Sequence, residues 1–92
     1  MKQLNDLRVQ AHRLKDSLGQ KRITGTALDG RVEIVMNGNH EVLSTTIDQG
    51  LLTPESKTKL EEALSEATNH ALQEIQQVIA QTMREFGGFP GL

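Results

Sequence analysis

Basic side chains are unevenly distributed in this sequence and gather toward the N-terminus. The segment 1–31 contains seven basic and three acidic side chains, a net charge of +4, whereas 32–92 contains three basic and nine acidic ones, a net charge of −6. Because the potential at a surface is set by the charges nearest to it, the N-terminal segment can attract a polyanion although the whole chain has a net charge of −2. The ordinary alternative is that these charges only keep a helix surface soluble. The seven basic residues are Lys2, Arg8, Arg13, Lys15, Lys21, Arg22 and Arg31.

One histidine has carboxylates at helical spacing on both sides. His70 lies four residues from both Glu66 and Glu74, so a helix would place the three side chains on one face. Such a row could in principle bind a metal ion. Rows of this kind are more commonly solvated helix faces with weak charge pairs, and we therefore predict no metal site.

The residues that could support catalysis are few. The hydroxyl residues 44–46 lie close to Asp48, but no histidine is placed to complete a nucleophilic site. The Gly87-Gly88 pair follows a helix instead of opening one, which is the wrong order for a phosphate-binding loop. The chain has no cysteine, which excludes disulfides, thiolate metal sites and cysteine nucleophiles. We predict a protein that is not an enzyme and needs no cofactor.

The basic segment is predicted to be helical. Apolar residues recur at alternating intervals of three and four, which predicts an amphipathic helix from about residue 2 to residue 18, and Gly19 is a typical C-terminal stop. We expect the apolar stripe to pack on the rest of the fold or on a second subunit. The alternative is that it docks a helix of another protein. The stripe consists of Leu4, Leu7, Ala11, Leu14 and Leu18.

The hydrophobic period then changes to two, which predicts strands. The alternation covers residues 23–28, 32–36 and 42–47. Asp29-Gly30 and Asn37-Gly38 supply tight turns between them, and Asn-Gly is the strongest short hairpin signal. Two tight turns predict an antiparallel meander with one buried face.

A long helix is predicted to follow the strands. Thr53 is a suitable N-cap and Pro54 a suitable first helical residue, and the pattern continues to about Phe86, roughly 33 residues or about 50 Å. Strands are only about 20 Å long, so this helix must extend beyond the sheet. Its apolar stripe continues past Val78, and the overhang must be covered. We therefore predict a homodimer.

The chain is predicted to form a single domain over residues 1–86, followed by a Gly/Pro-rich flexible tail over 87–92. Only 36% of the residues are hydrophobic and 2% aromatic, and no apolar run approaches 18 residues. The N-terminus lacks the apolar stretch of a signal peptide. The expected location is the cytoplasm.

Six short segments along the chain form a series that is informative as a whole. They are Val32–Gly38, Ile47–Asp48, Leu51–Leu52, Leu60–Leu64, Ala67–Ala71 with the pattern Ala-x-Asn-x-Ala, and Pro90–Leu92. In this order they resemble the YbaB/EbfC family of small bacterial nucleoid-associated proteins. The resemblance extends over almost the whole chain, and no single segment is diagnostic.

The resemblance implies an α+β subunit of the order α-β-β-β-α and a homodimer whose helices project like tweezer arms. It also implies DNA binding in the nucleoid with little or variable sequence preference. Two sets of about three lysine and arginine contacts, one set from each subunit, would suit weak binding of double-stranded DNA, and we expect no cofactor. In the family, DNA contacts are attributed to the projecting helices. The basic positions that match this role here are Lys2, Arg8, Arg13, Lys15, Lys21 and Arg22.

The long helix leaves an alternative function open, because it is poor in positive charge. Only Arg84 follows Lys57 and Lys59 along it, and glutamines occupy much of its polar surface. The alternative is an adaptor that binds a protein partner through the acidic long helix, without significant DNA binding.

Overall fold

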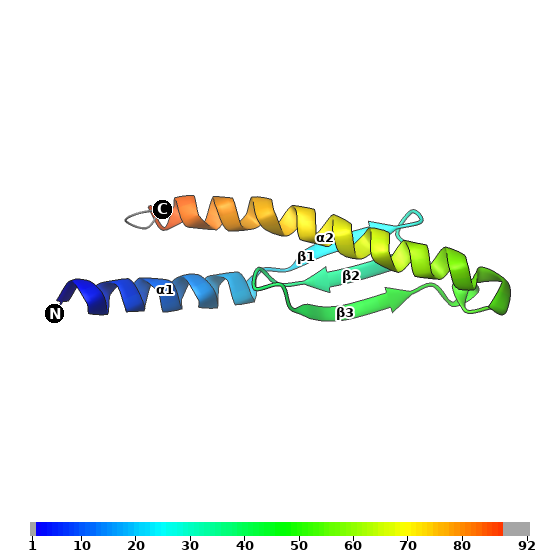
Figure 1. Cartoon of the computed structure of the whole chain (residues 1–92), viewed down its shortest axis with the longest axis horizontal. Helices are drawn as coiled ribbons and strands as arrows, with labels where there is room; N and C mark the ends of the chain where they lie inside the picture. Colours follow the sequence, from blue (N-terminus) through cyan, green and yellow to red (C-terminus); the bar gives the residue numbers. More distant parts are fainter. Residues whose placement is uncertain (1, 88–92) are drawn as a thin grey trace.

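The computed structural model describes residues 2–87, with side chains from residue 6 onward. It confirms the predicted α-β-β-β-α order and the α+β class (Figure 1). Two short 3-10 turns, Gln49–Leu51 and Pro54–Ser56, connect the last strand to the second helix. The helices and strands are α1 (Lys2–Gln20), β1 (Ile23–Ala27), β2 (Val32–Met36), β3 (Val42–Ile47) and α2 (Lys57–Glu85).

The three strands form an antiparallel sheet in the order β1-β2-β3, as the meander prediction requires. Gly25 of β1 lies opposite Ile34 of β2, which in turn lies opposite Thr45 of β3. The predicted Asp29-Gly30 turn is confirmed: its two central residues have positive φ angles of 55° and 86°, and the Arg31 N–H donates to the carbonyl of Leu28 at 3.1 Å. This backbone matches the right-handed twist of the flanking strands.

The core is formed by one face of α2 and one face of β1 and β2. Small residues follow one another at intervals of four along α2, so the helix backbone can lie close to the strands. Leu51, from the first 3-10 turn, is buried in the same core. The buried core residues are Ile23, Ala27, Val32, Ile34, Met36, Leu51, Ala63, Ala67, Ala71 and Ile75.

The third strand differs from the prediction, because neither of its faces is buried. Five of its six residues are exposed and only Ile47 is partly buried. The reason is that α2 contacts β1 and β2 and does not extend across β3 (Figure 1). The single buried face therefore covers two strands instead of three.

The second helix begins later than predicted. Pro54–Ser56 forms a 3-10 turn, and α2 starts at Lys57. Thr53 makes no capping bond to the backbone, and its hydroxyl is instead 3.0 Å from Ser56 Oγ. At the other end the prediction is confirmed, because Gly87 has a φ of 73° and its N–H donates to the carbonyl of Arg84.

Two glycines act differently from the prediction. The first helix continues through Gly19 to Gln20 instead of stopping before it. Gly38 does not have a positive φ, so Asn37-Gly38 is not the predicted two-residue turn. The connection between β2 and β3 instead spans residues 37–41, with a register shift at Val35/Met36 and a positive φ of 65° at His40.

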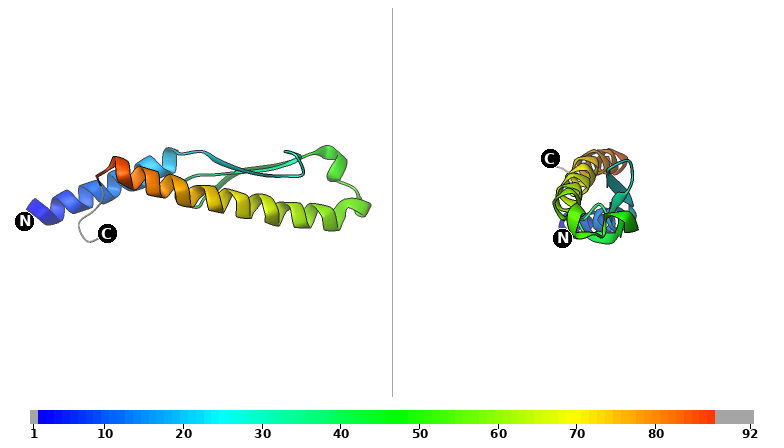
Figure 2. Two further views of the ribbon diagram at one scale, coloured as in Figure 1. Left: turned by 90° about the horizontal axis from the view of Figure 1, so that it is seen from above. Right: turned by 90° about the vertical axis from the view of Figure 1, so that its right-hand side faces the viewer.

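The molecule is elongated, with extents of 62 × 17 × 15 Å. The first helix and the C-terminal half of the second extend beyond the sheet at the same end of the molecule (Figures 1 and 2). The turn between β2 and β3 lies at this end, beside the C-terminus of α1 (Figure 1). The basic segment is therefore carried on a projecting helix.

Candidate nucleic-acid interface

Three basic residues of α1 are placed where an external ligand could reach them. Arg8, Arg13 and Lys15 are all exposed. Across residues 6–87, no carboxylate forms an ion pair with any of the three. The side chain of Lys2 and residues 88–92 of the tail predicted at 87–92 lie outside the described residues.

These three residues do not form a single row. Arg8 and Lys15 are seven residues apart, almost two full turns, so they lie along one flank of α1. Arg13 follows Arg8 by five residues and therefore lies about 140° around the helix axis from it. A straight DNA backbone would meet one of these two surfaces at a time.

The remaining two predicted residues lie just beyond the end of α1. Lys21 is partly buried, and its N–H donates to the carbonyl of Leu18 at 3.2 Å. The guanidinium Nη1 of Arg22 lies 3.3 Å from the carbonyl oxygen of Gly19 and 3.2 Å from that of Lys21. A cation at this position is favourable to the C-terminal end of the helix dipole. Arg22 therefore has a structural role that the three α1 side chains lack.

Acidic side chains lower the net positive charge of the projecting helix α1. Asp16 lies on α1 beside His12, with 3.4 Å between Oδ2 and Nε2, and both side chains are exposed. Asp6 is also on α1 and exposed. The side chains of residues 6–20 thus contain three basic and two acidic groups. The positive potential around α1 is accordingly modest.

The polar face of α2 has a different character. Between Lys59 and Arg84 it has no basic residue apart from His70. The exposed side chains along it are carboxylates in the first half and amides in the second: Glu61, Glu62, Glu66, Gln73, Gln76, Gln77 and Gln81. This surface does not attract phosphate.

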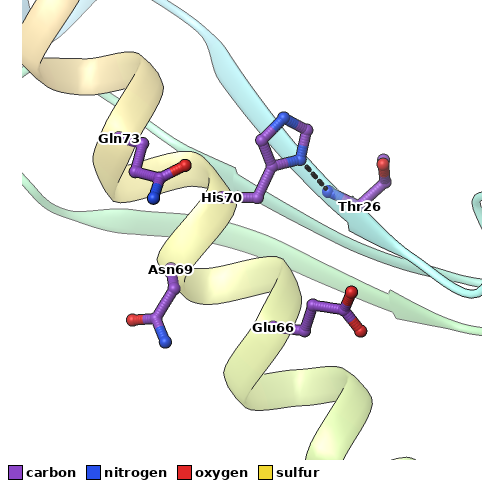
Figure 3. A pocket seen from close by; sticks show the side chains of 5 residues that line it. All are labelled: Thr26, Glu66, Asn69, His70 and Gln73. Carbon is purple, nitrogen blue, oxygen red and sulfur yellow. Dashed lines mark hydrogen bonds between the residues drawn. The ribbon is translucent and has the colours of Figure 1, made fainter.

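The histidine with carboxylate neighbours is held by the backbone of β1. The Thr26 N–H donates to His70 Nδ1 at 3.0 Å, at the edge of an open depression between β1 and α2 (Figure 3). This bond uses one of the two ring nitrogens, and the other lies 3.9 Å from Glu74 Oε1. The carboxylate of Glu66 does not turn toward the ring (Figure 3). Within the described part of the chain, no three potential metal ligands come together.

Comparison with known proteins agrees with this arrangement. The family model described as the YbaB/EbfC DNA-binding family matches residues 1–89. The chain belongs to the YbaB/EbfC family. A "nucleoid-associated protein" of Pelotomaculum thermopropionicum is 35% identical, with an alignment that covers 100% of this chain and 90% of that protein. A second "nucleoid-associated protein", from Syntrophobacter fumaroxidans, is 33% identical, with an alignment that covers 100% of this chain and 86% of that protein.

A solved structure supports the fold alone. The crystal structure of an uncharacterized protein from Helicobacter pylori aligns with a TM-score of 0.80 and 21% identity, covering 95% of this chain and 91% of that one.

The YbaB/EbfC family is a family of DNA-binding proteins and not of enzymes. No helix among residues 2–87 is long and apolar enough to cross a membrane.

Two residues that contact the C-terminal end of α1 were not found from the sequence. Gly38 and Asn39 lie in the turn between β2 and β3, and both contact the backbone of α1. Their residue types predicted only a turn, because Asn-Gly-Asn is turn chemistry wherever it occurs. The contact with a helix some twenty residues earlier has no signal in the local sequence.

Proposed function

We propose that this YbaB/EbfC protein binds double-stranded DNA weakly and with little sequence preference, through the basic side chains of α1 in a homodimer. The observation that carries the proposal is the position of Arg8, Arg13 and Lys15, exposed and free of ion pairs to the described carboxylates on a projecting helix. Phosphate contacts by lysine and arginine supply affinity without reading the sequence. The expected location is the cytoplasm, on the nucleoid.

The absence of sequence preference follows from the kind of groups available. The projecting helix α1 offers lysine and arginine at scattered positions, and residues 6–20 include no Phe, Tyr or Trp side chain for base stacking. The two projecting helices of a dimer would together supply a few phosphate contacts. An architectural role, in which DNA is held without a defined site, suits this set of groups.

A second copy of the chain is the partner that β3 best supports. The strand is at the edge of the sheet and has no charged residue or proline, the usual features that keep an edge strand from pairing. Val42 and Leu43, at the start of the strand, are 55% and 45% exposed, and Leu52, in the chain beyond the other end of the strand, is 62% exposed. Pairing β3 with its copy would be self-complementary about a two-fold axis and would remove this apolar surface from water.

The first experiment is fluorescence anisotropy with random-sequence duplex DNA at about 50 mM and about 200 mM salt. If each complex makes three to four phosphate contacts, the association constant should fall by about 40-fold to about 150-fold between these two salt concentrations. Absence of binding even at the lower salt concentration would overturn the DNA-binding proposal for this protein.

Charge reversal then identifies the contact surface. The triple variant Arg8→Glu, Arg13→Glu, Lys15→Glu should abolish the DNA complex while the far-UV circular dichroism stays that of the native protein. The double variant of Arg8 and Lys15 and the single variant of Arg13 separate the two surfaces of α1. Reversal of Lys57 and Lys59, at the far end of the molecule, is the charge-matched control for the double variant. Retained binding by the triple variant would mean that another surface is used.

The second candidate function is a protein-binding adaptor, and the polar face of α2 favours it. Glu61, Glu62 and Glu66 are exposed and together form an acidic surface suited to a basic partner. The salt titration discriminates between the two functions. A chain that is dimeric and folded but does not bind DNA would leave the adaptor as the better interpretation.

A further inference from the structure

Most of α1 is not packed against the described part of the chain, and its contacts with α2 are few. Every described side chain from residue 6 to residue 13 is exposed, including the apolar Leu7 and Val9 at 40% and 48%. Burial begins only near the C-terminal end, where Leu14 and Ser17 are partly buried and Leu18 is 8% exposed. The direction in which the helix projects must therefore be set at its base.

The turn between β2 and β3 contacts that base at two points. The Gly38 N–H donates to the carbonyl of Leu18 at 2.8 Å, and the Asn39 Nδ2 group donates to the carbonyl of Lys15 at 3.1 Å. These two carbonyls are three residues apart, about one turn of helix. One contact would fix only the position of the helix end, whereas two contacts one turn apart also fix the direction of its axis.

The turn is itself held in a defined shape by a buried asparagine. Asn37 is 4% exposed, and its Oδ1 accepts the N–H groups of Asn39 and Glu41 at 2.9 and 3.1 Å. Its Nδ2 donates to the carboxylate of Glu41 at 2.8 Å. All the polar atoms of the Asn37 side chain are thus in hydrogen bonds within the turn. Because these hydrogen bonds make the turn rigid, its contacts with α1 can fix the position of that helix.

The absence of a side chain at Gly38 allows the close approach. A Cβ added there would lie 2.8–2.9 Å from Leu18 Cδ2, Cβ and carbonyl oxygen. Because one of these atoms belongs to the helix backbone, a change of the Leu18 rotamer could not relieve the clash. Gly38 has an ordinary φ, so the need for glycine comes from the helix contact and not from the turn conformation.

We infer that Gly38 and Asn39 are positioning residues that fix the direction of α1 and, through it, the placement of Arg8, Arg13 and Lys15 against the DNA backbone. The first half of this inference concerns the protein alone, and the second half rests on the proposed function. A helix held in one direction presents its charges already oriented, so less conformational freedom is lost when DNA binds. A helix released at its base would carry the same charges with lower affinity.

The direction of the helix can be measured without DNA. The chain has no cysteine, so Gln10→Cys on α1 and Ser65→Cys on α2 give a unique pair of exposed sites for spin labels. Double electron–electron resonance, with labelled protein diluted by excess unlabelled protein, reports the distance within one chain. We expect Gly38→Ala to shift the mean distance and Asn39→Ala to broaden the distribution.

Two control variants separate positioning from loss of stability. Gly30→Ala places a side chain at a φ of 86° with nothing within 4 Å, so it strains the turn between β1 and β2 without touching α1. Asn69→Ala is the matched control for Asn39→Ala. It removes an exposed asparagine side chain of α2 that makes no hydrogen bond with any of the residues 6–87. Both controls should leave the distance distribution unchanged. Unchanged distributions for Gly38→Ala and Asn39→Ala would overturn the inference.

Binding to DNA tests the second half, because positioning and contact residues affect the salt dependence differently. The slope of log K against log salt concentration counts phosphate contacts. Asn39→Ala should weaken binding by about threefold to tenfold at every salt concentration and leave this slope unchanged. Removing Arg8 and Lys15 should instead reduce the slope.

The outcomes of the two measurements are distinguishable. A changed distance with unchanged affinity would overturn the positioning role while leaving the helix contact established. Wild-type protein that does not bind DNA would overturn the proposed function together with that role. The distance measurement would still decide whether Gly38 and Asn39 fix the direction of α1.

Discussion

Gly25 lies where the backbone of α2 passes close to β1. A Cβ added at this residue would overlap the backbone of Ala67 and of Ala71 on the helix. The φ of Gly25 is not in the left-handed region, so the requirement for glycine is one of space. The buried alanines of α2 and the glycine of β1 together allow the helix and strand backbones to approach each other.

The variant Gly25→Ala should therefore be strongly destabilised. Because the clash is with backbone atoms, the helix must move away from β1, and we expect a loss of about 3 kcal/mol in the free energy of unfolding. Gly30→Ala is the comparison, since its penalty of about 1–2 kcal/mol comes from φ alone. Urea denaturation at one protein concentration measures both. Equal losses for the two variants would contradict the importance of the close approach.

At the scale of elements, β3 is the strand that a single copy of the chain leaves unpaired along one edge and uncovered on both faces. It pairs with β2 on one side, and its other edge and both of its faces are exposed. In β1 and β2, by contrast, every second residue is buried and the residues between them are partly buried or exposed, as in a sheet with one covered face. The proposed dimer uses β3 because it is the strand that α2 does not cover.

Substitution of Leu43 by lysine should separate the copies. Leu43 is 45% exposed in the single chain, so Leu43→Lys leaves the core of that chain intact while adding a charge to the proposed pairing strand. We expect the dimer dissociation constant to rise by about 30-fold or more, the effect of losing a central interface residue. Analytical ultracentrifugation measures this change.

Val9→Lys is the matched control for that experiment, because Val9 is 48% exposed and lies on α1 away from the strand. It should remain as dimeric as the wild-type protein. A Leu43→Lys protein with an unchanged dissociation constant would show that the copies associate through a surface other than β3.

At the scale of the whole molecule, the elongated shape explains why a single copy has only a small hydrophobic core. The chain extends over 62 Å but is only 15–17 Å thick, and four of its eleven buried hydrophobic residues among those described are alanines. Small domains bury a low fraction of their surface, and an elongated shape lowers it further. Association would supply the missing buried area.

Thermal stability should therefore depend on protein concentration. If folding is coupled to association, a hundredfold increase in concentration should raise the melting temperature by about 5–10 °C. Circular dichroism in cells of different path length covers this range. Leu43→Lys should remove the dependence, and a wild-type melting temperature independent of concentration would contradict the coupling.

The order of elements could be predicted because it depends on local patterns. The change of hydrophobic period from helix to strand and back is present in the sequence, and so is the glycine that ends α2. The exposed basic residues of α1 were predicted for the same reason, since the polar face of an amphipathic helix lies in water. The start of α2 was predicted less well, because Pro54 suits a 3-10 turn as well as a first helical turn.

The amino-acid sequence by itself determined which segments are helical or extended and where the positive charge lies, since neighbours along the chain set both. Only the tertiary structure decided that α2 covers β1 and β2 but not β3, and that Gly38 is needed for its contact with Leu18. It also decided that Asn39 holds the end of α1. These relations join residues far apart in the sequence, and residue type alone carries no information about which distant backbone a side chain will meet.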